Sequence, residues 1–81
     1  MVSDRYEDSV VTEELKKLAH IATDMQLSSK MRDQAISQLG ELGSHEALLV
    51  LLNLAANDRL NRDTRDLALK KARDIIKKSP Q

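Results

Sequence analysis

Residues 28–57 read SSKMRDQAISQLGELGSHEALLVLLNLAAN, and this stretch decides the fold. Apolar residues recur every three or four positions from Met31 to Leu42, which predicts one amphipathic helix. Ser28 or Ser29 can cap its start, Gly43 suits the left-handed backbone that ends a helix, and Ser44 can cap the next helix. Because the connection is so short, we expect two antiparallel neighbouring helices.

Gly40 lies inside the first of these helices, one turn before the predicted end. A glycine in a helix interior costs about 1 kcal/mol relative to alanine. A glycine at such a position marks the close approach of another backbone. We therefore expect a neighbouring helix to pack against Gly40.

The second helix of the stretch, predicted over residues 46–57, has almost no polar face. A helix that is apolar on all sides is buried on several sides, or it covers its extra face with a partner. Leu49 and Val50 are predicted to point away from the side that carries Leu48, Leu51, Leu52 and Ala55. Together with Leu67 they are our apolar candidates for partner contacts, and packing inside a four-helix core is the alternative.

Two further helices flank this hairpin. Helical spacing predicts one from Thr12 to about Met25, and one that Asn61 or Asp63 caps and that ends near Lys77, before Pro80. Residues 1–11 show no period, and we predict a flexible N-terminal arm there. The sequence thus predicts a single helical domain over residues 12–78.

The two halves of the chain resemble each other at an offset of 33 residues. Residues 13–43 align with residues 46–76 without a gap and give eight identities in thirty-one pairs, among them the string Arg-Asp-x-Ala at 32–35 and at 65–68. Repeats of this length with two helices per unit indicate a solenoid. The conservative pairs are Ile21/Leu54, Ile36/Leu69 and Leu42/Ile75.

The repeated string resembles short HEAT repeats of the phycobilisome-lyase type. Their units look like Arg-x-x-Ala-x-x-x-Leu-Gly-x-Leu-Gly, then an apolar helix and a loop that contains Asp, and residues 32–43 follow this pattern. The resemblance covers residues 13–78. It implies an all-α, four-helix α-solenoid of HEAT-like hairpins with right-handed stacking of antiparallel pairs.

Two pairs of charged residues take a structural role in this resemblance. Asp24 with Arg32, and Asp58 with Arg65, match the Asp and Arg positions that stabilise the loops between such units. The fourth helix departs from the pattern, because residues 72–74 read Ala-Arg-Asp where Leu-Gly-x is expected.

The composition excludes several classes of site. The 81 residues include no cysteine and one aromatic residue, Tyr6, so a disulfide or a thiolate metal site cannot form and aromatic stacking platforms are disfavoured. His20 and His45 lie on different predicted helices, no nucleotide or nucleophile motif occurs, and the longest apolar run is too short for a membrane helix. We expect a cytoplasmic non-enzyme with no catalytic residues, metal or cofactor and no membrane association.

Charge is distributed unevenly although the net charge is zero. Residues 1–46 hold nine acidic and five basic residues, a balance of −4, and residues 47–81 hold four acidic and eight basic ones, a balance of +4. A rod polarised in this way favours head-to-tail stacking or an acidic partner at its C-terminal end. The basic candidates for partner contacts are Arg62, Lys70, Arg73 and Lys77.

The sequence therefore predicts a small adaptor or scaffold that binds another protein or forms a homodimer. Weak phosphate or nucleic-acid binding through the basic C-terminal helix is one alternative. An accessory subunit of an enzyme complex is another, since a shared architecture does not fix a function.

Overall fold

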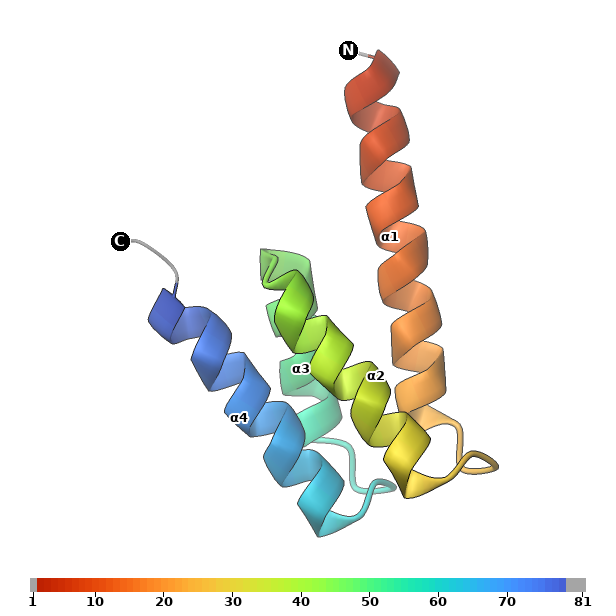
Figure 1. The fold of residues 1–81 in the computed structure, drawn as a ribbon, viewed down its shortest axis with the longest axis vertical. Helices are drawn as coiled ribbons and strands as arrows, with labels where there is room; N and C mark the ends of the chain where they lie inside the picture. Colours follow the sequence, from red (N-terminus) through yellow and green to blue (C-terminus); the bar gives the residue numbers. More distant parts are fainter. Residues whose placement is uncertain (1, 79–81) are drawn as a thin grey trace.

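A computed structural model of the protein describes residues 2–78, with their side chains from residue 12 onward. It contains the helices α1 (Val2–Thr23), α2 (Ser29–Leu42), α3 (His45–Ala55) and α4 (Arg62–Lys78), as Figure 1 shows. No strand occurs among the residues it describes. The prediction of an all-α chain with four helices is confirmed.

The helices form two antiparallel hairpins, α1–α2 and α3–α4, that lie side by side (Figure 1). Across the boundary between the hairpins α1 contacts α3, and α2 contacts both α3 and α4. Within the described part of the chain, α1 and α4 do not touch. Each helix therefore contacts the helix two places along the chain as well as its hairpin neighbour.

Local capping bonds set the ends of the helices. The Ser28 and Ser44 hydroxyls accept hydrogen bonds from backbone N–H groups at the starts of α2 and α3. The side-chain amide oxygen of Asn61 does the same for α4. Gly43, with a φ of 64°, ends α2 and donates its backbone N–H to the carbonyl of Leu39. These caps are among those that the sequence predicts.

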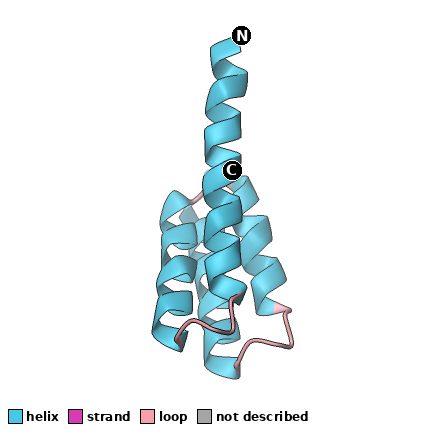
Figure 2. Ribbon diagram, turned by 90° about the vertical axis from the view of Figure 1, so that its right-hand side faces the viewer, coloured by secondary structure: helices cyan, strands magenta, loops and turns pink. Residues whose placement is uncertain are grey.

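Helix α1 is longer than predicted, because it begins at Val2 and not near Thr12. Its N-terminal turns extend past the ends of the other three helices (Figures 1 and 2). The backbone of the predicted arm is helical from residue 2 onward. An established helix can grow by one hydrogen bond per residue without an apolar stripe, and no glycine or proline in this segment opposes that growth.

The core lies between the hairpins and draws on all four helices. Ile36 and Leu39 of α2 and Leu51 of α3 have no exposed surface, and Ala68, Ala72 and Ile75 of α4 are also buried. At the boundary between α2 and α4, the hydroxyl of buried Thr64 donates to a carboxylate oxygen of Asp33 at 3.0 Å. The boundary thus has both apolar packing and one oriented polar contact.

Gly40 packs directly against α4, as its position in the sequence predicts. A methyl group placed on Gly40 would lie 3.0–3.3 Å from the side-chain carbons of Lys71. Real Cβ atoms rarely approach other atoms so closely. The glycine therefore permits the close spacing of α2 and α4, at a cost in helix propensity.

The two predicted Asp–Arg pairs differ from each other. Arg32 is buried and donates to the backbone carbonyls of Asp24 and Leu27, so the predicted contact between Asp24 and Arg32 forms through the backbone of Asp24 and not through its carboxylate. The carboxylate of Asp24 instead accepts the backbone N–H of Gln26, which fixes the turn after α1. Arg65 does approach Asp58, at 3.9 Å, but that carboxylate is almost fully exposed.

Candidate functional site

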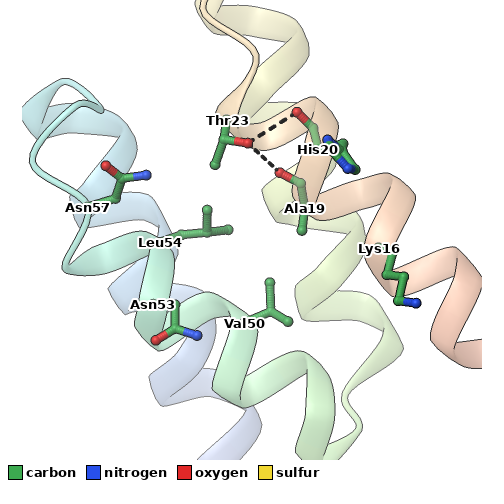
Figure 3. A pocket seen from close by; sticks show the side chains of 8 residues that line it. All are labelled: Lys16, Ala19, His20, Thr23, Val50, Asn53, Leu54 and Asn57. Atoms are coloured by element: carbon green, nitrogen blue, oxygen red, sulfur yellow. Dashed lines mark hydrogen bonds between the residues drawn. The ribbon is translucent and has the colours of Figure 1, made fainter.

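A groove of about 380 Å³ runs between the C-terminal half of α1 and the C-terminal half of α3 (Figure 3). It exists because the two hairpins lie side by side, which places α1 next to α3. The groove is open to solvent along one side. The residues that line it are Lys16, Ala19, His20 and Thr23 of α1, Val50, Asn53 and Leu54 of α3, and Asn57 just after α3.

The floor of the groove is apolar. Figure 3 shows Ala19, Val50 and Leu54 pointing into the space between the two helices. Leu54 is buried, and Val50 packs against the core. The Thr23 hydroxyl donates to the carbonyl oxygens of Ala19 and His20, at 2.9 and 3.3 Å, so its methyl group is the part available to a ligand. A ligand on this floor would therefore be held by apolar contact.

The rim of the groove is polar and carries no carboxylate among its lining residues. Lys16 and His20 are one turn apart on α1, and Asn53 near the end of α3 is four residues before Asn57 in the loop that follows. A lysine supplies three donors and an asparagine supplies both donors and an acceptor. The Asn57 side-chain oxygen already accepts the backbone N–H of Arg59 at 2.9 Å, which leaves its amide NH2 as donor.

This arrangement suits a carboxylate and a peptide group better than a metal ion. The groove supplies donors around an apolar floor, and an asparagine amide can pair with both the N–H and the C=O of a peptide. Within residues 12–78, whose side chains the structure describes, no group of three or more histidine, cysteine, aspartate or glutamate side chains is placed to hold a metal.

The apolar candidates from the sequence lie in different surroundings. Leu49 is about half exposed, whereas Val50 and Leu67 are partly buried against the core. Leu52, expected on the core side of α3, is exposed instead. The reason is that α3 is covered by α1 on the side of Val50, which turns Leu52 toward solvent. Of the three candidates, the groove includes Val50 alone.

None of the four polar residues of the rim was predicted as a site residue: Lys16, His20, Asn53 and Asn57. A signal for two of them was present, since His20 and Asn53 are equivalent positions of the 33-residue repeat. Equivalent positions lie side by side when repeat units stack. The repeat could therefore have paired these two positions, but it gives no sign of Lys16 or Asn57 and none of a groove between the helices.

The four basic candidates all lie on the exposed surface of α4. Spacings of three, four and eight residues place Arg62, Lys70, Arg73 and Lys77 on the side of the helix away from the core, together with Asp66. The one ion pair within 4 Å among the described side chains joins Arg65 and Asp58. The four cations are therefore open to a ligand or partner.

Comparison with known proteins finds no matching family model, no matching curated protein and no matching solved structure. Among the described residues, no helix combines the length and the apolar character that crossing a bilayer requires. The groove and the surfaces themselves are thus the basis for a functional interpretation.

Proposed function

We propose that this chain is a small, non-catalytic helical-repeat adaptor, and that the groove between α1 and α3 binds a segment of a partner protein. The observation that carries the proposal is an apolar floor bordered by donors and a lysine, with no carboxylate in the lining. By charge complementarity, the segment it would bind carries an aspartate or glutamate next to an apolar side chain.

The repeat supports the adaptor architecture. By the 33-residue offset, α1 is equivalent to α3 and α2 to α4, and each helix contacts its equivalent. A solenoid of HEAT-like hairpins would have contacts of this kind, with binding surfaces along rows of equivalent helices, and this supports the proposal. The sequence resemblance to short HEAT repeats of the phycobilisome-lyase type points the same way, and we propose that architecture, with right-handed stacking, for this chain.

The size of the groove limits what it can bind. A volume of about 380 Å³ is near the lower end of the range of about 300–1,000 Å³ that ligand sites occupy. It would therefore receive a short part of the partner, and a contact of that size is expected to be weak and transient.

The test uses two matched peptides, capped Asp-Leu-Asp and its neutral counterpart Asn-Leu-Asn, titrated into the isotope-labelled chain and followed by NMR. We expect the acidic peptide to shift the backbone amide signals of Lys16, His20, Asn53 and Asn57, and the neutral peptide to shift them less at equal concentration. Equal shifts with both peptides, or shifts spread over the whole surface, would contradict a role for charge in the groove.

Two neighbouring lysines provide a matched pair of variants. Lys16 lines the groove, whereas Lys17 is exposed and is not among the lining residues. We expect Lys16→Glu to remove the response to the acidic peptide, and Lys17→Glu, which changes the net charge equally, to retain it. A similar loss in both variants would indicate a general charge effect and would refute the groove as the site.

The second candidate is phosphate or nucleic-acid binding through α4, favoured by the four exposed cations that make no ion pair among the described residues. Asp66 lies between them and the net charge of the chain is zero, which weakens the field at this surface. Fluorescence anisotropy with a labelled oligonucleotide at low salt tests it. Binding that falls steeply as salt is added would support this candidate, and an unchanged anisotropy would exclude it.

A further inference from the structure

Equivalent positions of the two repeat units differ sharply in burial. Each of three pairs joins one core residue with one exposed residue, although both members are large and aliphatic. The exposed fractions are 0% for Ile36 and 38% for Leu69, 4% for Leu54 and 36% for Ile21, and 5% for Ile75 and 39% for Leu42.

The neighbouring hairpin explains this difference. Ile36 lies one turn from Gly40 and Asp33, the α2 residues that contact α4, and Ile75 lies one turn from Lys71, which contacts Gly40 of α2. Leu54 lines the groove beside α1.

Within the described residues, no further hairpin packs on the side of α4 that carries Leu69 or on the side of the first hairpin that carries Ile21 and Leu42. The chain thus exposes two apolar surfaces, one at each end of the pair of hairpins. They are equivalent to the two surfaces that meet at the boundary between the hairpins.

Further apolar side chains gather at the same two ends. Figure 1 shows α1 and α2 at one side of the molecule and α4 at the other. We call the exposed face with Ile21, Met25, Met31 and Leu42 the leading face, and the exposed face with Leu52, Leu69 and Ile76 the trailing face. On each helix, spacing places these residues opposite the side that packs on the other hairpin.

Charge distinguishes the two faces. A shallow hollow of about 350 Å³ in the leading face is lined by Glu14, Leu18, Gln38, Glu41 and Leu42, so it is acidic. The trailing face is bordered by exposed Arg62 and Arg73 of α4, with exposed Asp66 between them, so the basic side chains are in excess there. The charge balance of −4 in residues 1–46 and +4 in residues 47–81 has the same polarity.

We propose that the chain binds a second copy of itself head to tail, with the trailing face of one copy on the leading face of the next. The contact would follow the register of the contact that already joins the two hairpins inside each copy, at a wider spacing, because Arg73 stands at the position equivalent to Gly40. The repeat, the unequal burial of equivalent residues and the opposite charge of the two faces all select a second copy as the occupant.

The internal contact also supplies the register. Inside each copy, Gly40 of the first unit lies against Lys71 of the second. Arg73 is the equivalent of Gly40, and Gln38 is the equivalent of Lys71. At the seam we therefore expect Arg73 of one copy to lie beside Gln38 of the next. Glu41 of that next copy is one helical turn from Gln38, within reach of the Arg73 guanidinium. Arg73 and Glu41 are therefore the charged pair expected at the seam.

The seam between copies is weaker than the internal boundary. Inside each copy, the Thr64 hydroxyl donates to Asp33 across the boundary between the hairpins. At the seam, the equivalent positions are Met31 of one copy and Asp66 of the other. Methionine has no hydroxyl, so this hydrogen bond cannot form between copies. We therefore expect reversible association that dissociates on dilution. Because the two faces differ, each added copy leaves both kinds of face free, and assembly does not stop at a dimer.

The test is analytical ultracentrifugation of the full chain from about 5 µM to about 1 mM, at low and at high salt. We expect the average mass to rise with concentration beyond that of a dimer, and to fall when salt is added. A monomer over the whole range would overturn the proposal, as would a dimer that saturates, since it would indicate a symmetric interface.

Two blocked variants make the test specific. Leu69→Glu blocks the trailing face and Leu42→Glu blocks the leading face, and both positions are exposed enough for the fold to tolerate the change, which circular dichroism verifies. Each variant alone should remain monomeric. Mixed in equal amounts they should form a dimer that does not grow, because one intact face of each kind remains. Failure of the folded variants to combine would refute head-to-tail binding.

A control and a charge exchange complete the experiment. Leu49 is exposed and is equivalent to Lys16. Lys16 remains exposed although the second unit packs beside it, so Leu49 should also remain exposed when a second copy binds. We therefore expect Leu49→Glu to leave assembly unchanged. Arg73→Glu should weaken assembly at low salt, and mixing it with Glu41→Arg should restore growth beyond a heterodimer, because the native seam joins the two variants into a dimer and the exchanged Glu–Arg seam then joins one dimer to the next. A loss with Leu49→Glu equal to that with Leu69→Glu would contradict the assigned faces. The groove proposal is tested separately by the Lys16 variants.

Discussion

Replacement of Arg32 by methionine should destabilise the fold strongly, because Arg32 holds the connection between α1 and α2. The buried guanidinium donates to the backbone carbonyls of Asp24, at 3.2 Å, and of Leu27, and also to the Ser29 hydroxyl at 3.2 Å. Methionine keeps much of the length and apolar stem of the side chain, and it removes all three donors.

The magnitude follows from the two carbonyl bonds. A hydrogen bond to a charged group contributes about 1.5–3 kcal/mol, so two of them at the lower limit give about 3 kcal/mol. A chain of this length has a free energy of unfolding of roughly 4–12 kcal/mol. The variant should therefore lose between a quarter and most of the stability of the protein.

The repeat provides the matched control, since Arg65 is the equivalent of Arg32. Arg65 is partly exposed and makes one long ion pair, 3.9 Å, with a carboxylate that is almost fully exposed. Pairs of that kind contribute little to stability. Arg65→Met should therefore be much less destabilising than Arg32→Met.

Urea unfolding followed by circular dichroism at 222 nm measures both variants on the same scale. We expect a much lower midpoint for Arg32→Met and a midpoint near that of the parent for Arg65→Met. Changes that agree within about 0.5 kcal/mol would show that the buried carbonyl bonds do not stabilise the loop, and the reasoning from burial would be wrong.

Three further changes test the fold by thermal and urea unfolding. Thr64→Val should cost about 1 kcal/mol, and a double-mutant cycle with Asp33→Ala should assign that loss to their hydrogen bond. Gly43→Ala should cost about 1–2 kcal/mol, since alanine resists a φ of 64°; an unchanged midpoint would contradict this. Ser44→Ala should cost about 1 kcal/mol through its lost cap, and Ser44→Asp should recover most of it.

Helix ends and the close helix contact could be predicted because local bonds and backbone geometry set them. The caps at Ser28, Ser44 and Gly43 involve groups no more than four residues apart, so residue type and spacing are sufficient. Gly40 indicated a neighbouring helix because little else explains a glycine in that position. The start of α1 at Val2 was missed, because growth of a helix by backbone hydrogen bonds leaves no periodic signal.

The buried face of α3 could not be chosen from its composition. Residues 47–56 contain nine apolar residues and one asparagine, so several rotations of the helix bury a similar apolar area. Contact with α1 on one side buries Leu54 and half-buries Val50, and it leaves Leu49 and Leu52 exposed. Burial on such a helix depends on which neighbours it has.

The sequence alone predicted the four helices and the antiparallel arrangement of α2 and α3, because propensity, capping and short connections act over a few residues. The pairing into the hairpins α1–α2 and α3–α4 appeared only in the structure. The groove depended on the tertiary structure. Lys16 and His20 lie more than thirty residues from Asn53 and Asn57, and they border one groove because the hairpins pack side by side. Long-range packing places them together, and no local pattern encodes that distance.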